Sequence, residues 1–418
     1  MSQAQLLEKV AVRKDLFARR LAVALALAFT AIPLGAEDKL SLQQTDVFVA
    51  GGDGYHTYRI PSLLVSKKGA VLAFCEGRRT GRADSGDIDL VLKRSTDRGS
   101  TWSNLQLIWD DGANTCGNPC PVLDEKTGTI WLTMTHNDGR DKEHDIKART
   151  ATSTRTVWVS RSDDEGATWS KPTEISSAVK EPSWTWYATG PGVGIQIKHG
   201  PHRGRLVIPC DHTYDDPAGD LRGLPLEYGS HIFYSDDHGK TWKLGGTIRP
   251  KMNECQVVEL ADGKGTLRMD MRSYFGRSRR AQSVSRDGGA SWSVPEDDRA
   301  LVEPVCQASI LRYTWPERRD KSRILFSNPA DEKQRKNLTV RLSYDEGKSW
   351  PVSQTINAGP SGYSCLTILP NRDVGCLYER GEKIYSERIS LARFTLDWLT
   401  DGKDSLSGKK QEATASRP

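Results

Sequence analysis

The chain has 418 residues, a formal net charge of +5 and 27% charged residues. It contains 12 Trp and 37 Gly, and long apolar runs are scarce after the first forty positions. This composition indicates a soluble protein of many short strands joined by turns. The small net charge gives no sign of a nucleic-acid-binding surface, so we expect no nucleic-acid partner.

The amino-terminal residues have the order of a secretory signal. Basic residues up to Arg20 precede an uncharged apolar stretch from Leu21 to Ala36. This stretch is shorter than the roughly 20 residues that span a bilayer. We therefore expect a signal peptide over residues 1–36, no stable membrane span after processing, and a secreted or periplasmic protein. An uncleaved anchor is the alternative, because Leu34 fits a cleavage site imperfectly.

A repeated string predicts the fold. The pattern Ser-X-Asp-X-Gly-X-Thr/Ser-Trp occurs five times, beginning at Ser95, Ser162, Ser235, Ser285 and Ser343. Its Asp can accept backbone N–H bonds within a tight turn, and its Gly supplies a positive φ. Apolar alternation before each copy favours a hairpin centred on the string. Calcium binding is the alternative function, but each copy offers one fixed carboxylate and a cation site needs several.

The spacing of the copies is too long for a helical solenoid. The copies start 50 to 73 residues apart, which suits one four-stranded unit with its loops. We expect an all-β fold, a six-bladed β-propeller of four-stranded antiparallel blades over residues 37–400, with one blade that lacks the string. Residues 401–418 are rich in Lys, Ser, Asp and Gly and are predicted to be a disordered polar tail.

The cysteines leave two interpretations open. The chain has eight Cys, an even number that permits disulfides outside the cytosol. Cys116 and Cys120 are close enough in sequence to suggest a bridge, whereas the others lie in apolar contexts that suit buried thiols. The pairing cannot be decided from the sequence.

The five strings, together with Tyr58-Arg59-Ile60-Pro61, resemble the sialidase (neuraminidase) family, in which the string is known as the Asp box. The resemblance covers nearly all of the chain after residue 36, in the same order. It implies an exo-α-sialidase that hydrolyses terminal α-linked sialic acid from glycoproteins, glycolipids or oligosaccharides. The family retains the anomeric configuration through a tyrosyl-enzyme intermediate. We expect a monomer that acts on sialylated glycoconjugates and needs no cofactor.

The substrate of such an enzyme calls for fixed cations. Sialic acid carries a carboxylate, and the planar fork of Arg pairs with a carboxylate bidentately. The family uses three arginines for this purpose. The resemblance matches them to Arg59, to Arg272 in Met-Asp-Met-Arg-Ser, and to Arg341 just ahead of the last Asp box. Arg268 is the rival of Arg272 if a hairpin insertion shifts the register.

The nucleophile of the family is a tyrosine. A carboxylate nucleophile would be repelled by an anionic centre, whereas a neutral phenol avoids this repulsion if a base takes its proton. The resemblance matches the phenol to Tyr363 and its base to Glu254. Glu259, five residues further along an alternating strand, is interpreted as structural or outward-facing.

An acid must protonate the leaving oxygen and later activate water. The resemblance matches this role to Asp84 on a Gly- and Ser-flanked loop, with Arg78 as a further substrate-binding arginine. Asp87 and Asp89 suit packing or turn roles, and their spacing does not fit a metal site, so we expect no metal. Glu379 matches a carboxylate that steadies Arg59.

The segment from Trp184 to Gly194 is aromatic and rich in Gly. The strand-like residues after it exclude a phosphate site at a helix terminus, and its aromatic side chains suit either sugar contact or packing. Two further functions stay open. One is a non-catalytic Asp-box propeller that binds glycans or protein. The other is the same fold with altered chemistry, namely transfer of sialic acid to another sugar, its intramolecular release, or action on a related nonulosonic acid.

Overall fold

The computed structural model describes residues 42–317 and 320–407, and the expected signal peptide lies outside these residues. The described chain is built almost entirely of antiparallel strands, which confirms the all-β expectation. Its helices are short, namely α2 (Glu143–Ala148), α3 (Ser176–Val179) and α4 (Leu396–Thr400). None of the helices within the described ranges has the length and apolarity needed to traverse a bilayer.

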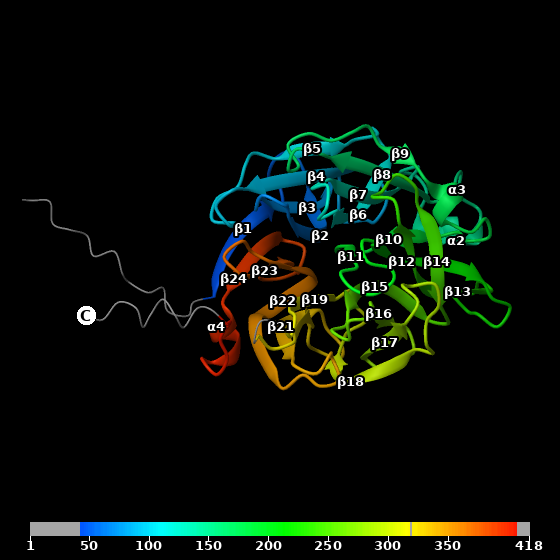
Figure 1. Cartoon of the computed structure of the whole chain (residues 1–418). Coiled ribbons are helices and arrows are strands. Elements are labelled where there is room, and N and C mark those ends of the chain that lie inside the picture. Colours follow the sequence, from blue (N-terminus) through cyan, green and yellow to red (C-terminus); the bar gives the residue numbers. More distant parts are fainter. Residues whose placement is uncertain (1–41, 318–319, 408–418) are drawn as a thin grey trace, which may run out of the picture. The chain divides into compact units, whose positions relative to one another are not determined.

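In chain order the strands form sheets of 8, 5, 4 and 7 strands, which we divide into successive groups of about four antiparallel strands (Figure 1). Group 1 contains β2 (Thr57–Val65), β3 (Val71–Arg78), β4 (Ile88–Ser95) and β5 (Gln106–Trp109). Group 2 contains β6 (Thr115–Leu123), β7 (Ile130–Asn137), β8 (Thr156–Ser162) and β9 (Thr173–Glu174). Group 3 contains β10 (Tyr187–Thr189) and β11 (Ile195–Gln196), which share one position, then β12 (Leu206–Asp215), β13 (Leu226–Ser235) and β14 (Lys243–Ile248).

The second half of the chain repeats the arrangement. Group 4 contains β15 (Met252–Glu259), β16 (Leu267–Ser273), β17 (Arg279–Ser285) and β18 (Glu296–Val302). Group 5 contains β19 (Ser309–Thr314), β20 (Arg323–Pro329), β21 (Lys336–Ser343) and the first half of β22 (Val352–Ile368). Group 6 contains the second half of β22, β23 (Val374–Arg380), β24 (Arg388–Phe394) and β1 (Gln43–Val49).

The last group is assembled from both ends of the described chain. Its outer strand β1 pairs antiparallel with β24, and Figure 1 shows the blue strand beside the red one. Its third and fourth strands are therefore far apart in sequence, and no hairpin joins them. The Asp boxes lie in the turns between third and fourth strands of the other groups. This explains why one group lacks the string.

Strands of neighbouring groups contact one another in a closed cycle. β2 contacts β6, β6 contacts β10, β11 and β12 of group 3, and β12 contacts β15. β19 contacts both β15 and β22, and β22 returns to β2. The buried apolar clusters lie between neighbouring sheets, so each group is stabilised by the next.

The hydrogen bonds of the Asp boxes confirm their role as turns. In the second box, Asp164 Oδ1 accepts from the backbone N–H of Thr168 at 2.8 Å, and Oδ2 accepts from its hydroxyl at 2.6 Å. The hydroxyl of Ser162 donates to Asp164 and accepts from the N–H of Gly166. The other four boxes repeat this pattern. Each carboxylate is therefore consumed within its own loop.

The box glycines also join one group to the one before it. A Cβ at Gly239 of group 3 would lie 2.1 Å from the ring of Trp131 in group 2, and its φ is +85°. Gly99 of group 1 lies in the same way against Leu391 of group 6. Glycine is required at these turns both by the backbone conformation and by the close approach. The boxes are hairpin staples that also hold the cycle together.

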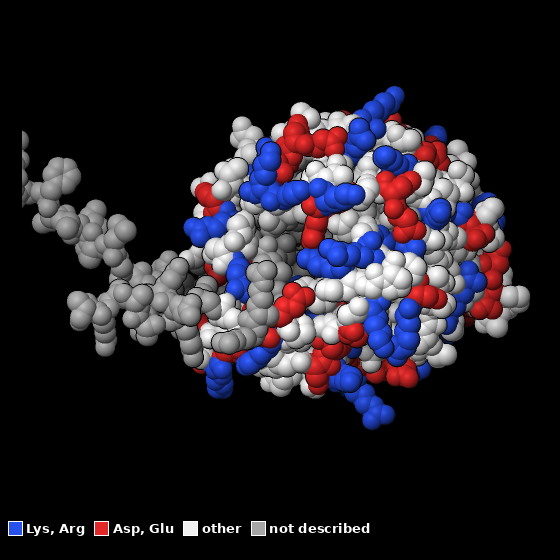
Figure 2. Space-filling view, in the orientation of Figure 1, with Lys and Arg blue, Asp and Glu red and all other residues white. Residues whose placement is uncertain are grey.

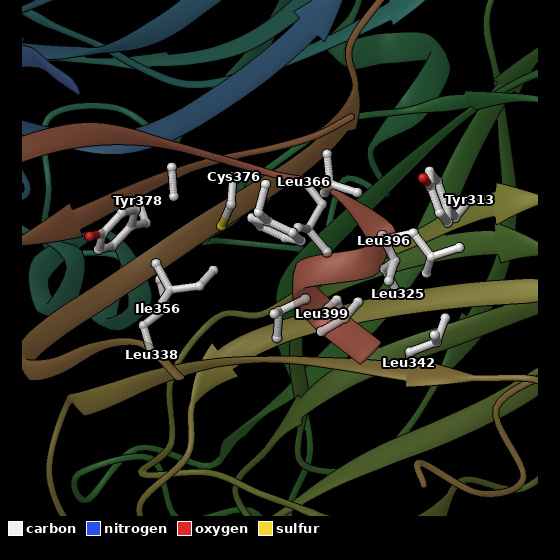
Figure 3. Packing of buried hydrophobic residues seen from close by; sticks show 14 of the residues in the cluster. Tyr313, Leu325, Leu338, Leu342, Ile356, Leu366, Cys376, Tyr378, Leu396 and Leu399 are labelled. Atoms are coloured by element: carbon white, nitrogen blue, oxygen red, sulfur yellow. The ribbon is translucent and has the colours of Figure 1, made fainter. Parts of the chain in front are cut away.

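The carboxyl-terminal segment packs further than expected. Leu396 and Leu399 of α4 belong to one buried cluster with Leu325 and Leu342 (Figure 3). Beyond the expected boundary at residue 401, Leu406 is buried in the same cluster, and the carboxylate of Asp404 accepts from the guanidinium of Arg323 at 2.7 and 2.8 Å. The packed part of the chain therefore reaches beyond residue 404. The remaining tail from residue 408 lies outside the described residues.

The cysteines are all buried free thiols. Cys116 and Cys120 both lie on β6 but form no bridge, so the second interpretation of the cysteines holds. Burial raises the pKa of the Cys75 thiol well above its ordinary value. These side chains act as small apolar groups in the core.

The close contact at the third Asp box yields a stability prediction. Gly239→Ala places a methyl group against the rigid indole of Trp131 and also disfavours the positive φ, so the free energy of unfolding should fall by about 3–5 kcal/mol. Gly51→Ala is the matched control, because Gly51 has a φ of +83° with no atom within 4 Å. Its cost should be about 1–2 kcal/mol. Urea denaturation measures both, and equal losses would contradict a packing role for the glycine.

Candidate active site

The groups converge on a cavity of about 350 Å³, and every group contributes to its wall. Six of the predicted site residues line it, namely Arg59, Arg78, Asp84, Glu254, Arg272 and Tyr363. The strand directions explain this convergence. Each Asp box lies at the end of a third strand, so the opposite edge holds the starts of first and third strands and the ends of second strands. The predicted residues that line the cavity come from that edge.

A phenol and a carboxylate meet in the cavity. Tyr363, at the start of the second half of β22, donates its hydroxyl proton to Glu254 Oε1 at the start of β15. Arg272, near the end of β16, donates to Glu254 Oε2 at 2.7 Å and to the Tyr363 hydroxyl at 3.3 Å. Burial and the charge of Glu254 raise the pKa of Tyr363 well above its ordinary value. The phenol therefore keeps its proton at neutral pH, with a base already in contact.

Three guanidiniums surround this pair. Arg59 of β2 and Arg335, which directly precedes β21, each lie over the rings of Tyr363 and Tyr385, at 5.2 to 5.4 Å from the ring centroids. Arg335 donates to the Tyr385 hydroxyl at 3.3 Å. Arg272 completes the set from group 4. Arg59, Arg272 and Arg335, here called the arginine trio, form a cationic wall beside the phenol.

Arg341 is the one predicted arginine that does not line this cavity. It lies well inside β21, opposite Phe326 and Ser353, and its Nη1 donates to Asn328 at 3.1 Å. Arg335 precedes it by six residues, which is about 20 Å along an extended strand. Arg341 was matched by its nearness to the Asp box, but the box marks the edge away from the cavity. An arginine at the opposite end of the third strand was the signal that the sequence offered.

Glu379 fixes the position of both Arg59 and Tyr363. Its carboxylate on β23 is fully buried and accepts from Arg59 Nε at 2.7 Å. It also accepts from the backbone N–H groups of Ile60 and Tyr363, each at 3.0 Å. A Cβ at Gly362 would lie 2.1 Å from its oxygen, so only glycine allows this approach. One buried anion therefore holds the first arginine and the phenol in register.

Asp84 stands at the mouth of the cavity. Its side chain is 64% exposed, and Arg78 Nη2 lies 2.8 Å from its Oδ1, with Arg59 Nη1 at 3.9 Å. Partial burial raises the pKa of Asp84, but the Arg78 and Arg59 guanidiniums outweigh it and hold this pKa below its ordinary value. Arg78 is itself held by Glu76 at 2.6 and 3.0 Å. Asp89 accepts from Tyr55 at 2.7 Å instead, which fits the packing role predicted for it.

Sequence reasoning missed several residues of the cavity wall, among them Glu76, Arg155, Asp211, Arg335 and Tyr385. Two of the alternatives that it raised are decided by geometry. Arg268 pairs with Asp298 at 2.9 Å away from the cavity. Glu259 accepts from the backbone N–H groups of Lys198 and His199.

The aromatic segment from Trp184 to Gly194, which contains β10, has residues in both of the roles considered for it, sugar contact and packing. Trp186 lines the cavity, whereas Trp184 stacks on His212 with ring centroids 3.6 Å apart. Among the described residues, no three or more His, Cys, Asp or Glu side chains are grouped as metal ligands. Figure 2 shows basic and acidic side chains interspersed over the face that it presents. A mixed face of this kind does not set up a strong single-sign field.

Comparisons with known proteins identify the family that the chain matches. It matches the family described as BNR repeat-like domain over residues 69–378. A sialidase of Micromonospora viridifaciens is 35% identical over 395 residues, which cover 90% of this chain and 56% of that protein. An exo-alpha-sialidase of Arthroderma benhamiae is 31% identical over 390 residues, which cover 85% of this chain and 88% of that protein. The chain thus spans little more than half of the Micromonospora relative.

Solved structures agree with this family. The Hadza microbial sialidase Hz136 superposes with a TM-score of 0.73 at 30% identity, covering 86% of this chain and 69% of that one. A leech intramolecular trans-sialidase superposes with a TM-score of 0.71 at 21% identity, covering 86% and 71%. The second likeness is one of fold alone.

The buried carboxylate that orders the site can be tested by stability. Glu379→Gln removes the anion that pairs with Arg59, so the free energy of unfolding should fall by about 3 kcal/mol or more. Glu332→Gln is the matched control, because Glu332 pairs with Arg279 at the surface and is 53% exposed. That change should cost at most about 1 kcal/mol. A small, equal loss in both variants by urea denaturation would refute the ordering role.

Proposed function

This chain belongs to the sialidase family, and from that premise we propose that it is a retaining exo-α-sialidase, which hydrolyses terminal α-linked sialic acid from glycoconjugates through a tyrosyl-enzyme intermediate. The observation that carries the proposal is the hydrogen bond between Tyr363 and Glu254 beside three guanidiniums. A neutral phenol in this role suits a substrate whose reacting carbon bears a carboxylate, because a carboxylate nucleophile would be repelled by that anion.

The arginine trio binds the substrate carboxylate. Guanidiniums pair with a carboxylate through parallel N–H···O bonds and stay charged at any pH at which the protein is folded. Glu379 anchors Arg59 through Nε, and Glu254 accepts from Arg272 through Nη1. Each of these arginines keeps other N–H groups for a ligand. The anomeric carbon, which bears the carboxylate, is thereby brought to the Tyr363 hydroxyl.

The chemical steps follow from the protonation states. Glu254 accepts the phenolic proton of Tyr363 while the phenol oxygen bonds to the anomeric carbon and the bond to the leaving oxygen breaks. Asp84, as the carboxylic acid, donates its proton to that oxygen. Asp84 then accepts a proton from water, whose oxygen attacks the anomeric carbon and releases Tyr363, which takes its proton back from Glu254. Two displacements retain the configuration.

Asp84 must carry a proton in the first step, although Arg78 and Arg59 depress its pKa in the free protein. Binding of the substrate carboxylate to Arg59 partly neutralises that guanidinium. The pKa of Asp84 therefore rises when the substrate binds, because a positive charge 3.9 Å away is compensated.

We further propose that the six groups are the six blades of a β-propeller, which the cyclic contacts and the box glycines support. Residues 37–400 would form this catalytic propeller, with residues 1–36 as a signal for secretion or export to the periplasm. Sialylated glycoconjugates are the proposed partners, and a monomer suffices because the described residues of one chain supply the whole wall of the cavity.

The proposed nucleophile and acid are tested by two substitutions. Tyr363→Phe and Asp84→Ala should each lower kcat for a fluorogenic sialoside by about 10²–10⁴-fold, since each removes a proton-transfer or bond-forming group. Stopped fluorimetric assays measure the rate, and NMR of the product identifies the released sugar and its first-formed anomer. Wild-type rates in either variant would exclude its assignment.

The identity of the third arginine is tested by a matched pair. Arg335→Met should raise KM or lower kcat/KM for the same sialoside by about 10–100-fold, because a charged hydrogen bond to the carboxylate is lost. Arg341→Met removes a guanidinium from the same region of sequence but outside the cavity, and should leave kcat/KM within about twofold. The opposite result, a loss in Arg341→Met and none in Arg335→Met, would make Arg341 the third carboxylate-binding arginine.

A further inference from the structure

Arg155 is a buried arginine in the wall of the cavity. It directly precedes β8 in group 2, lines the cavity and is 2% exposed. Its Nε has no hydrogen-bond partner in the part of the chain that the structure describes. The nearest source of negative charge, Glu76, already accepts from Arg78 and from the backbone N–H of Asn118. A buried guanidinium in this state lacks the acceptors that such a group normally has.

The contrast with the arginine trio is one of pairing. Burial lowers the pKa of Arg59 and of Arg272, but the Glu379 and Glu254 carboxylates outweigh it and raise both. For Arg155, burial dominates over the attraction of Glu76, and its pKa is lowered. An oxygen acceptor on a ligand would therefore stabilise the Arg155 guanidinium more than it would stabilise the guanidiniums of the trio.

A second unpartnered group lies in the same wall. Asp211 of β12 is 1% exposed, and its Oδ1 has no partner among the described residues, while Oδ2 accepts from Asn253 at 2.9 Å. Burial and the charge of Glu254 raise the pKa of Asp211 well above its ordinary value. Protonation of Asp211 is therefore favoured over its ordinary state, and a protonated carboxyl group can donate as well as accept a hydrogen bond. Arg155 of group 2 and Asp211 of group 3 thus each carry one buried polar atom that has no hydrogen-bond partner among the described residues.

The position of Arg155 identifies which part of a sugar it faces. In the cycle of six groups, group 2 lies opposite group 5, which carries Arg335 of the trio. A sialic acid whose C2 carboxylate is held by the trio directs the diametrically opposite ring atom, C5, toward group 2. The substituent on C5 is the one that varies between an acetamido group and a hydroxyl group. Arg155 is therefore placed to read that substituent.

The wall on this side offers little apolar surface. The apolar side chains that line the cavity are Ile60, Trp186 and Ala188, and Tyr228 and Tyr274 add two aromatic rings that stack on each other with centroids 4.9 Å apart. Ile60 packs with Tyr363 on the side of the nucleophile. The Arg155 guanidinium lies over the ring of Trp186 at 4.1 Å from its centroid, so this face of the indole is covered. The methyl of an acetamido group would have to replace water against charged groups, whereas a hydroxyl group would pair with them.

We propose that Arg155 is a specificity-determining residue, and that the preferred substrate is a nonulosonic acid with a hydroxyl group at C5 in place of the acetamido group. The inference rests on the proposed sialidase function and names its substrate class. A C5 oxygen accepts from the Arg155 guanidinium, directly or through one water, and its own proton is accepted within the same polar wall. A site built for a hydroxyl group discriminates against an analogue that cannot satisfy its buried polar atoms.

The test compares two 4-methylumbelliferyl glycosides that differ only at C5, with hydroxyl or acetamido. The wild-type protein should show a kcat/KM at least about 10-fold higher for the 5-hydroxy substrate. Arg155→Met, which keeps an unbranched stem without the fork, should lower kcat/KM for the 5-hydroxy substrate by about 10–100-fold and for the 5-acetamido substrate by much less. The ratio of the two substrates is the readout, because a purely structural defect would lower both rates alike.

The control is Arg161→Met. Arg161 lies on β8, six residues after Arg155, over the ring of Trp131 and outside the cavity. It should leave the substrate ratio unchanged. If Arg155→Met does not fold, Arg155→Lys is measured in its place, and the wild-type ratio decides by itself. Equal or better cleavage of the 5-acetamido substrate by the wild type overturns this inference alone, whereas cleavage of neither substrate removes the proposed function as well.

Discussion

The buried carboxylate of Glu379 is the interaction on which the site depends. It joins Arg59 of group 1 to the backbone of Tyr363 in group 6, across the junction where the cycle of groups closes. The pairing of β1 with β24 closes the same junction at the outer edge. The contacts that close the cycle of groups therefore also place the Tyr363 phenol beside Arg59. A buried anion can serve this role because three donors compensate its charge.

Pairing of charges also divides the cavity into two functional sides. On the side of groups 1, 4, 5 and 6, carboxylates hold Arg272 and Arg59 in fixed positions and leave the remaining N–H groups for an anion. On the side of groups 2 and 3, Arg155 and Asp211 keep unsatisfied polar atoms. In the proposed function, the first side binds the constant carboxylate and carries out chemistry on the carbon that bears it. The second side, in the further inference, contacts a substituent that differs between substrates.

The direction of each strand explains which of the predicted site residues line the cavity. The Asp boxes lie at one edge of the groups, and the cavity lies at the other, because successive antiparallel strands alternate in direction. Residues matched at the starts of first strands or the ends of second strands, such as Arg59, Glu254 and Arg272, therefore line the cavity. Arg341 is next to a box and does not. Arg335, which directly precedes the same strand at its opposite end, lies in the cavity wall where Arg341 was expected.

The sequence by itself determined the local features of this protein. The Asp-box turns and the all-β class follow from short motifs, because turn chemistry and strand alternation are properties of neighbouring residues, whereas the match of Tyr363 with Glu254 rested on the resemblance to the sialidase family. The tertiary structure alone decided that Arg335 and not Arg341 lines the cavity, that all the thiols are free, and that Arg155 Nε has no hydrogen-bond partner among the described residues. These depend on residues far apart in the chain meeting at one edge, and on how many acceptors reach a buried donor once they do.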